Sequence, residues 1–156
     1  MAIDFLDSVI VDGKLTVSSL ATSEDTLASA GDHGYNAETF VGGTSTATTA
    51  GRVYALTSVG WVFSNATSVA TKSIGLLGVA TGANSSSGMV IRGIVKLTAD
   101  PGGVVGDVMY LRNADGVVTN NTVTGIAGLV SRVVGHKLGT DVIFFNPSRD
   151  WIEISL

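Results

Sequence analysis

The sequence predicts an all-β protein, and three observations support this fold class. Apolar and polar residues alternate with a period of two, in short runs that are rich in β-branched side chains. Glycine-containing turns separate these runs at short intervals. Helical periodicity is absent from residues 51–156. About eight strands of this length form a small β-barrel or a β-sandwich.

Residues 1–20 form the first predicted element, an N-terminal β-hairpin that serves for attachment. Asp12 and Gly13 separate two apolar, largely β-branched runs, VIV and LTV, and this dipeptide tolerates the positive φ angles of a two-residue turn. An isolated hairpin is only marginally stable in water. We therefore expect it to pack on the body of the protein or on a neighbouring subunit.

Residues 21–50 are predicted to be an extended arm or linker. They are rich in Ser, Thr, Ala and Gly, and they bury too little apolar surface to offset the entropy of ordering. The chain is also asymmetric in charge, because residues 1–50 hold seven acidic residues and one lysine, whereas residues 51–156 have a net charge of +2. Opposite charges favour contact between the arm and the body, within one subunit or between neighbours.

Residues 51–156 are predicted to be a β-barrel body made of two similar halves, 51–95 and 106–146. Each half begins with glycine, a strand and a glycine turn, in GRVYALTSVGWVF and in GDVMYLRNADGVVT. An apolar strand containing glycine and then a last strand follow in both halves, at an offset of about 55 residues. The two halves are joined by residues 88–111, in which Pro101, Gly102 and Gly103 form a corner that no strand ladder includes.

A C-terminal strand is predicted over residues 150–156, after the strand-breaking sequence Asn-Pro-Ser. Apolar and polar residues alternate to the end of the sequence, and so apolar an end frays unless it is tied down. We expect it to complete the sheet or to add a strand to a neighbour.

The sequence indicates no catalytic, cofactor or metal site. His33 follows Asp32 in a polar loop, His136 lies at the end of a strand, and no nucleophile-elbow pentapeptide is present. The glycines of residues 102–106 lack the Lys-Ser/Thr of a phosphate-binding loop. The segment 113–116 lacks the full calcium-loop pattern, and the chain has no cysteine for thiol chemistry or zinc.

Composition also argues against nucleic-acid and membrane binding and favours self-association. There is no Lys/Arg cluster of the kind that neutralises phosphates, and apolar runs such as 74–80 fall short of the roughly 20 residues of a membrane helix. The start, MAIDFLDS, is unlike an export signal. Only 14% of residues are charged, against about 25% in typical soluble domains. With a mean hydropathy of +0.42, we expect much of the surface to be buried against other copies.

Residues 77–154 contain the motifs GMVIRGIVKL, GDVMYLRNADGVVT, RVVGHKL and FFNPSRDWIEI. This half of the chain resembles C-terminal β-modules of bacteriophage virion proteins. The step Gly-Asp-Val-X-Tyr-Leu is also similar to small β-barrel decoration proteins, which sit as trimers on phage capsids. The resemblance implies a virion protein, made in the host bacterial cytoplasm. It further implies a capsid decoration or cement protein that forms a homotrimer and contacts the major capsid protein or another virion protein.

Two other functions remain open alongside decoration of the capsid. A tail-fibre or tail-tip module would bind a host surface receptor, such as a glycan, through exposed loops like 81–87. A glycan-processing enzyme is disfavoured, since no convincing acidic pair is present. The residues that we expect at an oligomer or capsid interface are apolar and mostly aromatic or β-branched: Phe5, Leu6, Val9, Val11, Tyr35, Phe40, Trp61, Trp151 and Ile154.

Overall fold

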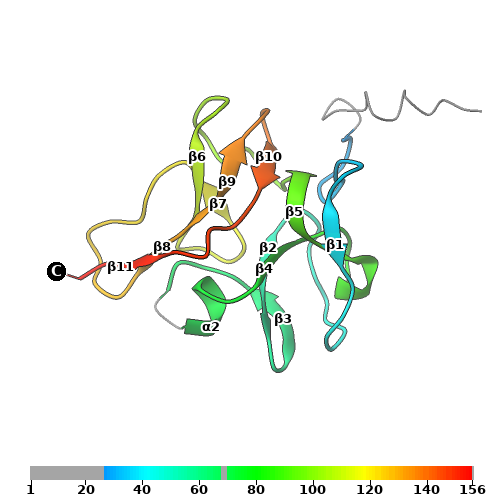
Figure 1. Ribbon diagram of the computed structural model, residues 1–156, viewed down its shortest axis with the longest axis horizontal. Helices are drawn as coiled ribbons and strands as arrows, with labels where there is room; N and C mark the ends of the chain where they lie inside the picture. The colour runs from blue at the N-terminus through cyan, green and yellow to red at the C-terminus, as the bar shows by residue number, and fades with distance from the viewer. Residues whose placement is uncertain (1–26, 68–69, 156) are drawn as a thin grey trace, which may run out of the picture.

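Figure 1 shows the computed structural model of the chain, which describes residues 27–67 and 70–155. The all-β prediction is confirmed, since the described helices are the short α2 (Ala70–Ser73) and the 3-10 helix η3 (Ser85–Ser87). The strands are β1 (Glu38–Phe40), β2 (Val53–Thr57), β3 (Gly60–Phe63), β4 (Leu77–Ala80), β5 (Met89–Lys96), β6 (Val108–Leu111), β7 (Val118–Thr119), β8 (Val130–Ser131), β9 (Val133–Lys137), β10 (Val142–Phe145) and β11 (Ile152–Glu153). The predicted hairpin of residues 1–20 lies outside the described residues.

The main sheet is antiparallel and curls into a half-barrel, with the strand order β3-β2-β4-β5-β10-β9-β6-β7. Read inward from its two edges, this order is β3-β2-β4-β5 on one side and β7-β6-β9-β10 on the other. In both cases a hairpin occupies the edge, and the third and fourth strands of the unit follow it. We call these two sets of four strands the first and second units; their strands lie within or next to the predicted half-repeats 51–95 and 106–146, whose origin by duplication stays a prediction.

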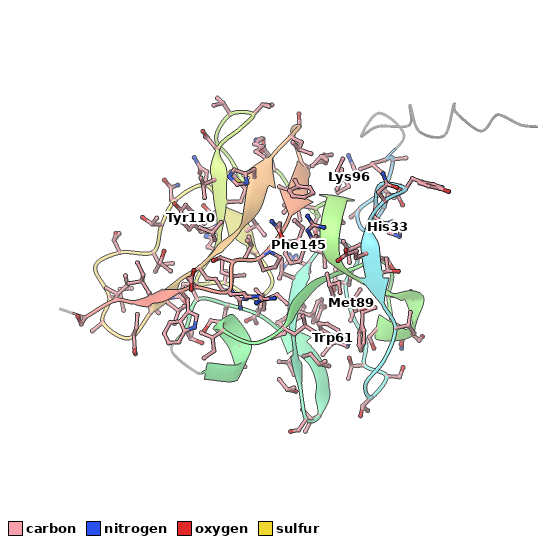
Figure 2. All side chains as sticks on the ribbon, viewed as in Figure 1. His33, Trp61, Met89, Lys96, Tyr110 and Phe145 are labelled. Atoms are coloured by element: carbon pink, nitrogen blue, oxygen red, sulfur yellow. The ribbon has the colours of Figure 1, made fainter. Side chains whose placement is uncertain are left out.

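One large hydrophobic core joins the two units. Buried side chains of β2, β4 and β5 contact buried side chains of β6, β9 and β10 on one face of the sheet, which we call the inner face. The largest of these side chains are fully buried, among them Phe145, Ile143, Met109, Leu111 and Leu77. Figure 2 shows Phe145 near the centre of the molecule. Each unit thus depends on the other to complete its core.

A second core cluster lies on the opposite face of the first unit. It consists of Tyr54, Trp61, Ala80 and Met89, with Phe40 packed against it. Trp61 and Met89 lie together beside β1 in Figure 2. The Phe40 and Trp61 rings meet edge to face, with centroids 6.2 Å apart. This arrangement is typical of buried aromatic pairs.

Residues 38–49 cover this second cluster, so this part of the predicted arm or linker over 21–50 packs on the body. β1 pairs with β5, and the Trp61 Nε1–H donates to the Gly42 carbonyl at 3.3 Å. The Thr49 N–H donates to the Tyr54 hydroxyl at 2.7 Å. Polar side chains and backbone pairing hold a segment that composition alone describes as unstructured.

The corner between the two units is fixed by a buried lysine. Lys137 Nζ donates to Asp100 Oδ1 at 2.5 Å and to the carbonyls of Gly102 and Gly103, each at 3.2 Å. The lysine side chain is 5% exposed, whereas that of Asp100 is about half exposed. A buried ammonium group is tolerated when its donors are satisfied in this way.

The predicted C-terminal strand forms within the chain, as β11. It pairs with β8 in a separate two-stranded sheet, with Ile152 opposite Ser131. The Ile154 N–H extends this pairing by donating to the Leu129 carbonyl at 2.7 Å. The C-terminal segment therefore adds its strand to a short sheet beside the main one, seen at the left of Figure 1.

Substitution of Gly135 by alanine should lower the free energy of unfolding by about 3 kcal/mol or more. Gly135 has a φ of +155°, and a Cβ there would overlap the Phe144 carbonyl group. Gly106→Ala is the matched control, because its φ is +97° but no atom lies within 4 Å of the added Cβ; backbone strain alone should cost about 1 kcal/mol. Urea denaturation measures the free energy of unfolding of both variants. Equal losses of stability would refute the role assigned to the overlap with the Phe144 carbonyl group.

The contribution of Asp100 to stability should depend on pH. The hydrogen bond from Lys137, followed by that from the Gly102 N–H, holds the pKa of Asp100 below its usual value. The stabilisation is therefore present above the unfolded-state pKa and is lost as the pH falls through the folded-state pKa. The difference in unfolding free energy between wild type and Asp100→Asn should shrink on acidification. A difference in unfolding free energy that stays constant from neutral to acid pH would count against the Lys137 contact. The same pH dependence in the control variant Asp150→Asn would also count against it.

Candidate interaction surface

The outer face of the second unit carries side chains that point away from the core. Directly opposed residues of antiparallel strands share a face, and Tyr110 is opposite Val133, while Val108 and Phe144 are both opposite His136. Strand neighbours of these residues, such as Met109, Val134 and Ile143, belong to the core on the inner face. These five outer side chains are half-buried or exposed.

The two units differ in what covers this face. In the first unit, residues 38–49 lie over the cluster of Tyr54 and Trp61. In the second unit, no further buried hydrophobic cluster forms on the outer face among the described residues. The two units therefore have comparable outer faces, and the described chain covers the first more fully.

A groove continues this face towards the C-terminal strand. Tyr110 and Val133 line it together with Trp151 and Ile152, which are 41% and 69% exposed. The volume of the groove is about 350 Å³. We define the outer patch as Val108, Tyr110, Val133, His136, Phe144, Trp151 and Ile152. Amphipathic aromatic rings and exposed aliphatic groups of this kind are typical of protein interfaces.

The structure places the residues predicted at an interface in different environments. Phe5, Leu6, Val9 and Val11 lie outside the described residues. Tyr35 is 75% exposed and Trp151 belongs to the outer patch, whereas Phe40 and Ile154 are half-buried within the chain. An interface role for Trp61 is corrected, because its side chain is 2% exposed and lies in the second core cluster.

Several members of the outer patch are not among the residues that we predicted at an interface. Tyr110 lies between Met109 and Leu111, both of which are buried, so strict alternation would have placed it on the outer face. The same reasoning applies to Phe144, between Ile143 and Phe145. The alternation of apolar and polar residues shows which side chains point outward. It does not show which outer face remains uncovered by other segments of the chain.

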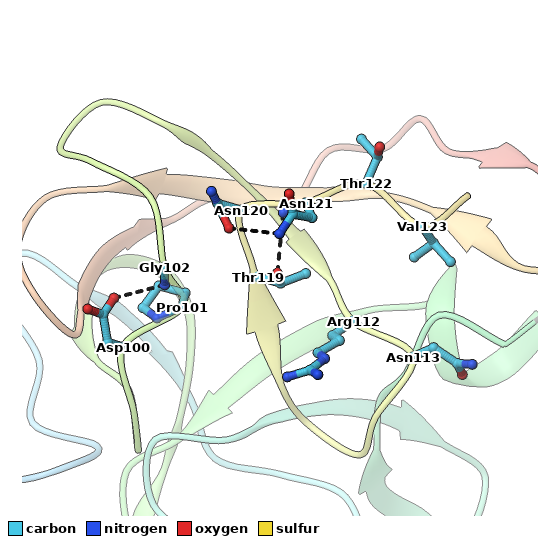
Figure 3. A pocket seen from close by; sticks show the side chains of 10 residues that line it. All are labelled: Asp100, Pro101, Gly102, Arg112, Asn113, Thr119, Asn120, Asn121, Thr122 and Val123. Atoms are coloured by element: carbon cyan, nitrogen blue, oxygen red, sulfur yellow. Dashed lines mark hydrogen bonds between the residues drawn. The ribbon is translucent and has the colours of Figure 1, made fainter. Parts of the chain in front are cut away.

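A separate pocket of about 490 Å³ lies beside the corner of the chain (Figure 3). Its lining is rich in amides, from Asn113, Asn120 and Asn121, and includes Arg112 and Asp100. The Asn121 side chain donates to Asn120 Oδ1 at 3.2 Å. No aromatic ring lines this pocket, so it offers hydrogen bonds without a stacking platform for a sugar.

The predicted receptor loop, 81–87, is held firmly by its neighbours. Asn84 caps η3 by accepting from the Ser86 N–H, and it also accepts from the Ser45 hydroxyl at 2.7 Å. The Thr48 hydroxyl donates to the Gly82 carbonyl at 2.7 Å. These contacts fix the loop against the segment that precedes β2.

Asp32 and His33, the neighbouring acid and histidine of the sequence, each lie close to backbone groups. Asp32 Oδ2 accepts from the backbone N–H groups of Ala28 and Ser29, while His33 Nδ1 lies 3.2 Å from the Gly34 carbonyl. Within residues 27–67 and 70–155, no group of three or more His, Asp or Glu side chains is placed to hold a metal. In the same part of the chain, no helix is both long enough and apolar enough to span a membrane.

Comparison of the chain with protein families, with curated proteins and with solved structures finds no match. The class of protein that the fold and surface define is an all-β chain with an open apolar patch.

Replacement of Ile152 by aspartate should weaken self-association about tenfold or more, because a charge would be buried in an apolar contact. Sedimentation velocity over a range of concentrations measures the effect. Val59→Asp is the matched control, since Val59 is 68% exposed in the turn between β2 and β3, away from the outer patch. Equal weakening by the two substitutions, or a wild-type chain that is monomeric at micromolar concentration, would contradict a role for the patch.

Proposed function

We propose that this chain is a structural protein of a bacteriophage virion, and most specifically a decoration or cement protein that assembles as a homotrimer on the capsid surface. The observation that carries the proposal is the outer patch, an apolar surface left open on a chain with few charges. Burial of this patch between copies or against capsid subunits would account for the low share of charged residues and the high mean hydropathy. The resemblance of residues 77–154 to phage virion modules supports the same class.

Stabilisation of a capsid by such a protein would come from contact area. A partner that binds only the assembled state stabilises it by mass action, and specific interfaces bury on the order of 1,600 Å² in total. The β-body would supply a rigid patch through the outer face of its second unit. The N-terminal segment, with Phe5, Leu6, Val9 and Val11, would supply contacts to neighbouring virion subunits.

A tail-fibre or tail-tip module that binds a host receptor is the second candidate function. The amide-rich pocket favours it, because Asn113, Asn120 and Asn121 offer donors and acceptors that suit sugar hydroxyls. Glycan binding that is lost in Asn120→Ala and retained in Asn36→Ala, which lies outside this pocket, would favour a tail module over decoration.

Capsid binding tests the leading proposal directly. The purified full chain should co-sediment with capsids of the phage that encodes it and should raise their temperature of disruption. Ile152→Asp should reduce this binding, because loss of the oligomer also removes its multivalency, whereas Val59→Asp should bind like the wild type. A chain that fails to bind capsids, or that binds them without any stabilising effect, would contradict a cementing role.

A further inference from the structure

Arg132 is a buried cation with no counter-charge among the described residues. Its side chain is 6% exposed, and the ion pairs of the described residues do not include it. Its Nε donates to the Ser148 carbonyl at 2.8 Å, and Nη1 donates to the Ser73 and Gly75 carbonyls at 2.9 and 2.8 Å. Burial lowers the pKa of the guanidinium, which is the direction expected when a charge is desolvated without a carboxylate partner.

These three carbonyls hold the guanidinium in a fixed orientation, while Nη2 has no hydrogen-bond partner within the described part of the chain. Arg132 lines a pocket of about 350 Å³, together with Arg149. No aspartate or glutamate lines the pocket, and Asp150 lines the groove of the outer patch instead. The pocket therefore combines two cationic side chains with no anionic one.

The remaining walls of the pocket are largely apolar. Ile74, Leu76, Leu77 and Ile91 line it, and Leu76 is 46% exposed. An inorganic anion would pair with the arginines but would leave these walls in contact with water. The walls and the arginines together fit a ligand that carries carboxylates beside bulky apolar groups.

We propose that the Arg132 pocket binds residues 4–7 of a second copy of this chain, the sequence Asp-Phe-Leu-Asp. Two carboxylates flank two bulky apolar side chains in this segment, which complements two arginines beside an apolar wall. The surrounding charges agree, since residues 1–50 have a net charge of −6 and residues 51–156 a net charge of +2. The inference rests on the proposed function in so far as it requires copies of the chain to assemble.

The start of the described chain and the pocket lie in different parts of the molecule. Figure 1 shows the described chain beginning beside β1, at the opposite side of the molecule from α2 and β8. The pocket lies next to these elements, because Ile74 follows α2 and Arg132 follows β8. A contact from the N-terminal segment of one copy to the pocket of the next is head-to-tail, and such contacts close into rings when the rotation allows it.

Photo-cross-linking of the full chain tests this contact. Phe5 is replaced by p-benzoylphenylalanine, and equal amounts of isotopically heavy and light chains are mixed, irradiated and mapped by mass spectrometry. We expect cross-links from position 5 to residues 74–77 or to Ile91, in pairs that combine heavy and light chains. Arg149→Glu should reduce their yield about tenfold, by reversing one charge of the pair. Arg149 is the residue of choice because it is exposed, whereas Arg132 also braces three backbone carbonyls.

The control is Arg112→Glu, which changes an exposed arginine outside the pocket and should leave the yield unchanged. Combining Asp4→Lys and Asp7→Lys with Arg149→Glu should restore part of the lost yield. Cross-links confined to single chains, cross-links to other regions, or equal effects of Arg149→Glu and Arg112→Glu would overturn the inference. An oligomer without the expected cross-link would refute this contact alone, whereas a chain that stays monomeric would refute the proposed function as well.

Discussion

The antiparallel pairing of β5 with β10 is the contact on which the rest of the structure depends. It runs from Val142 opposite Lys96 to Phe145 opposite Gly93, and it joins two four-stranded units that share one core. Phe145 is fully buried at this seam. Gly93, with a φ of +132°, leaves room there for Ala37. The seam therefore joins the two units and also receives the segment that precedes the sheet.

The candidate interaction surface follows from the way in which the two units differ. Residues 38–49 cover the outer face of the first unit, where Trp61 and Met89 form a second core. The corresponding face of the second unit presents Tyr110, Val133 and Phe144, beside the exposed Trp151 and Ile152 of the C-terminal segment. A sheet with one outer face closed by its own chain and another left open suits the proposed assembly with further copies or with a capsid.

Local patterns predicted the strands of the two units well, because period-two alternation and glycine turns are properties of neighbouring residues. β1 was missed, since Glu38, Thr39 and Phe40 lie among small polar residues and their pairing with β5 is long-range. Trp61 was placed at a surface for a similar reason. Alternation shows that Trp61 and Phe63 share a face, but it does not reveal that a distant segment covers that face. The burial of Arg132 depends on carbonyls from two other parts of the chain, which no local pattern indicates.

Apolar burial and charge complementarity form the physical basis of the proposed role on a capsid. A decoration protein covers the whole capsid surface, whereas a tail module occurs only at one end of the particle. If the proposal holds, counting the copies of this chain in purified virions separates these roles most directly. Decoration predicts hundreds of copies per particle. A handful of copies, or none, would contradict it.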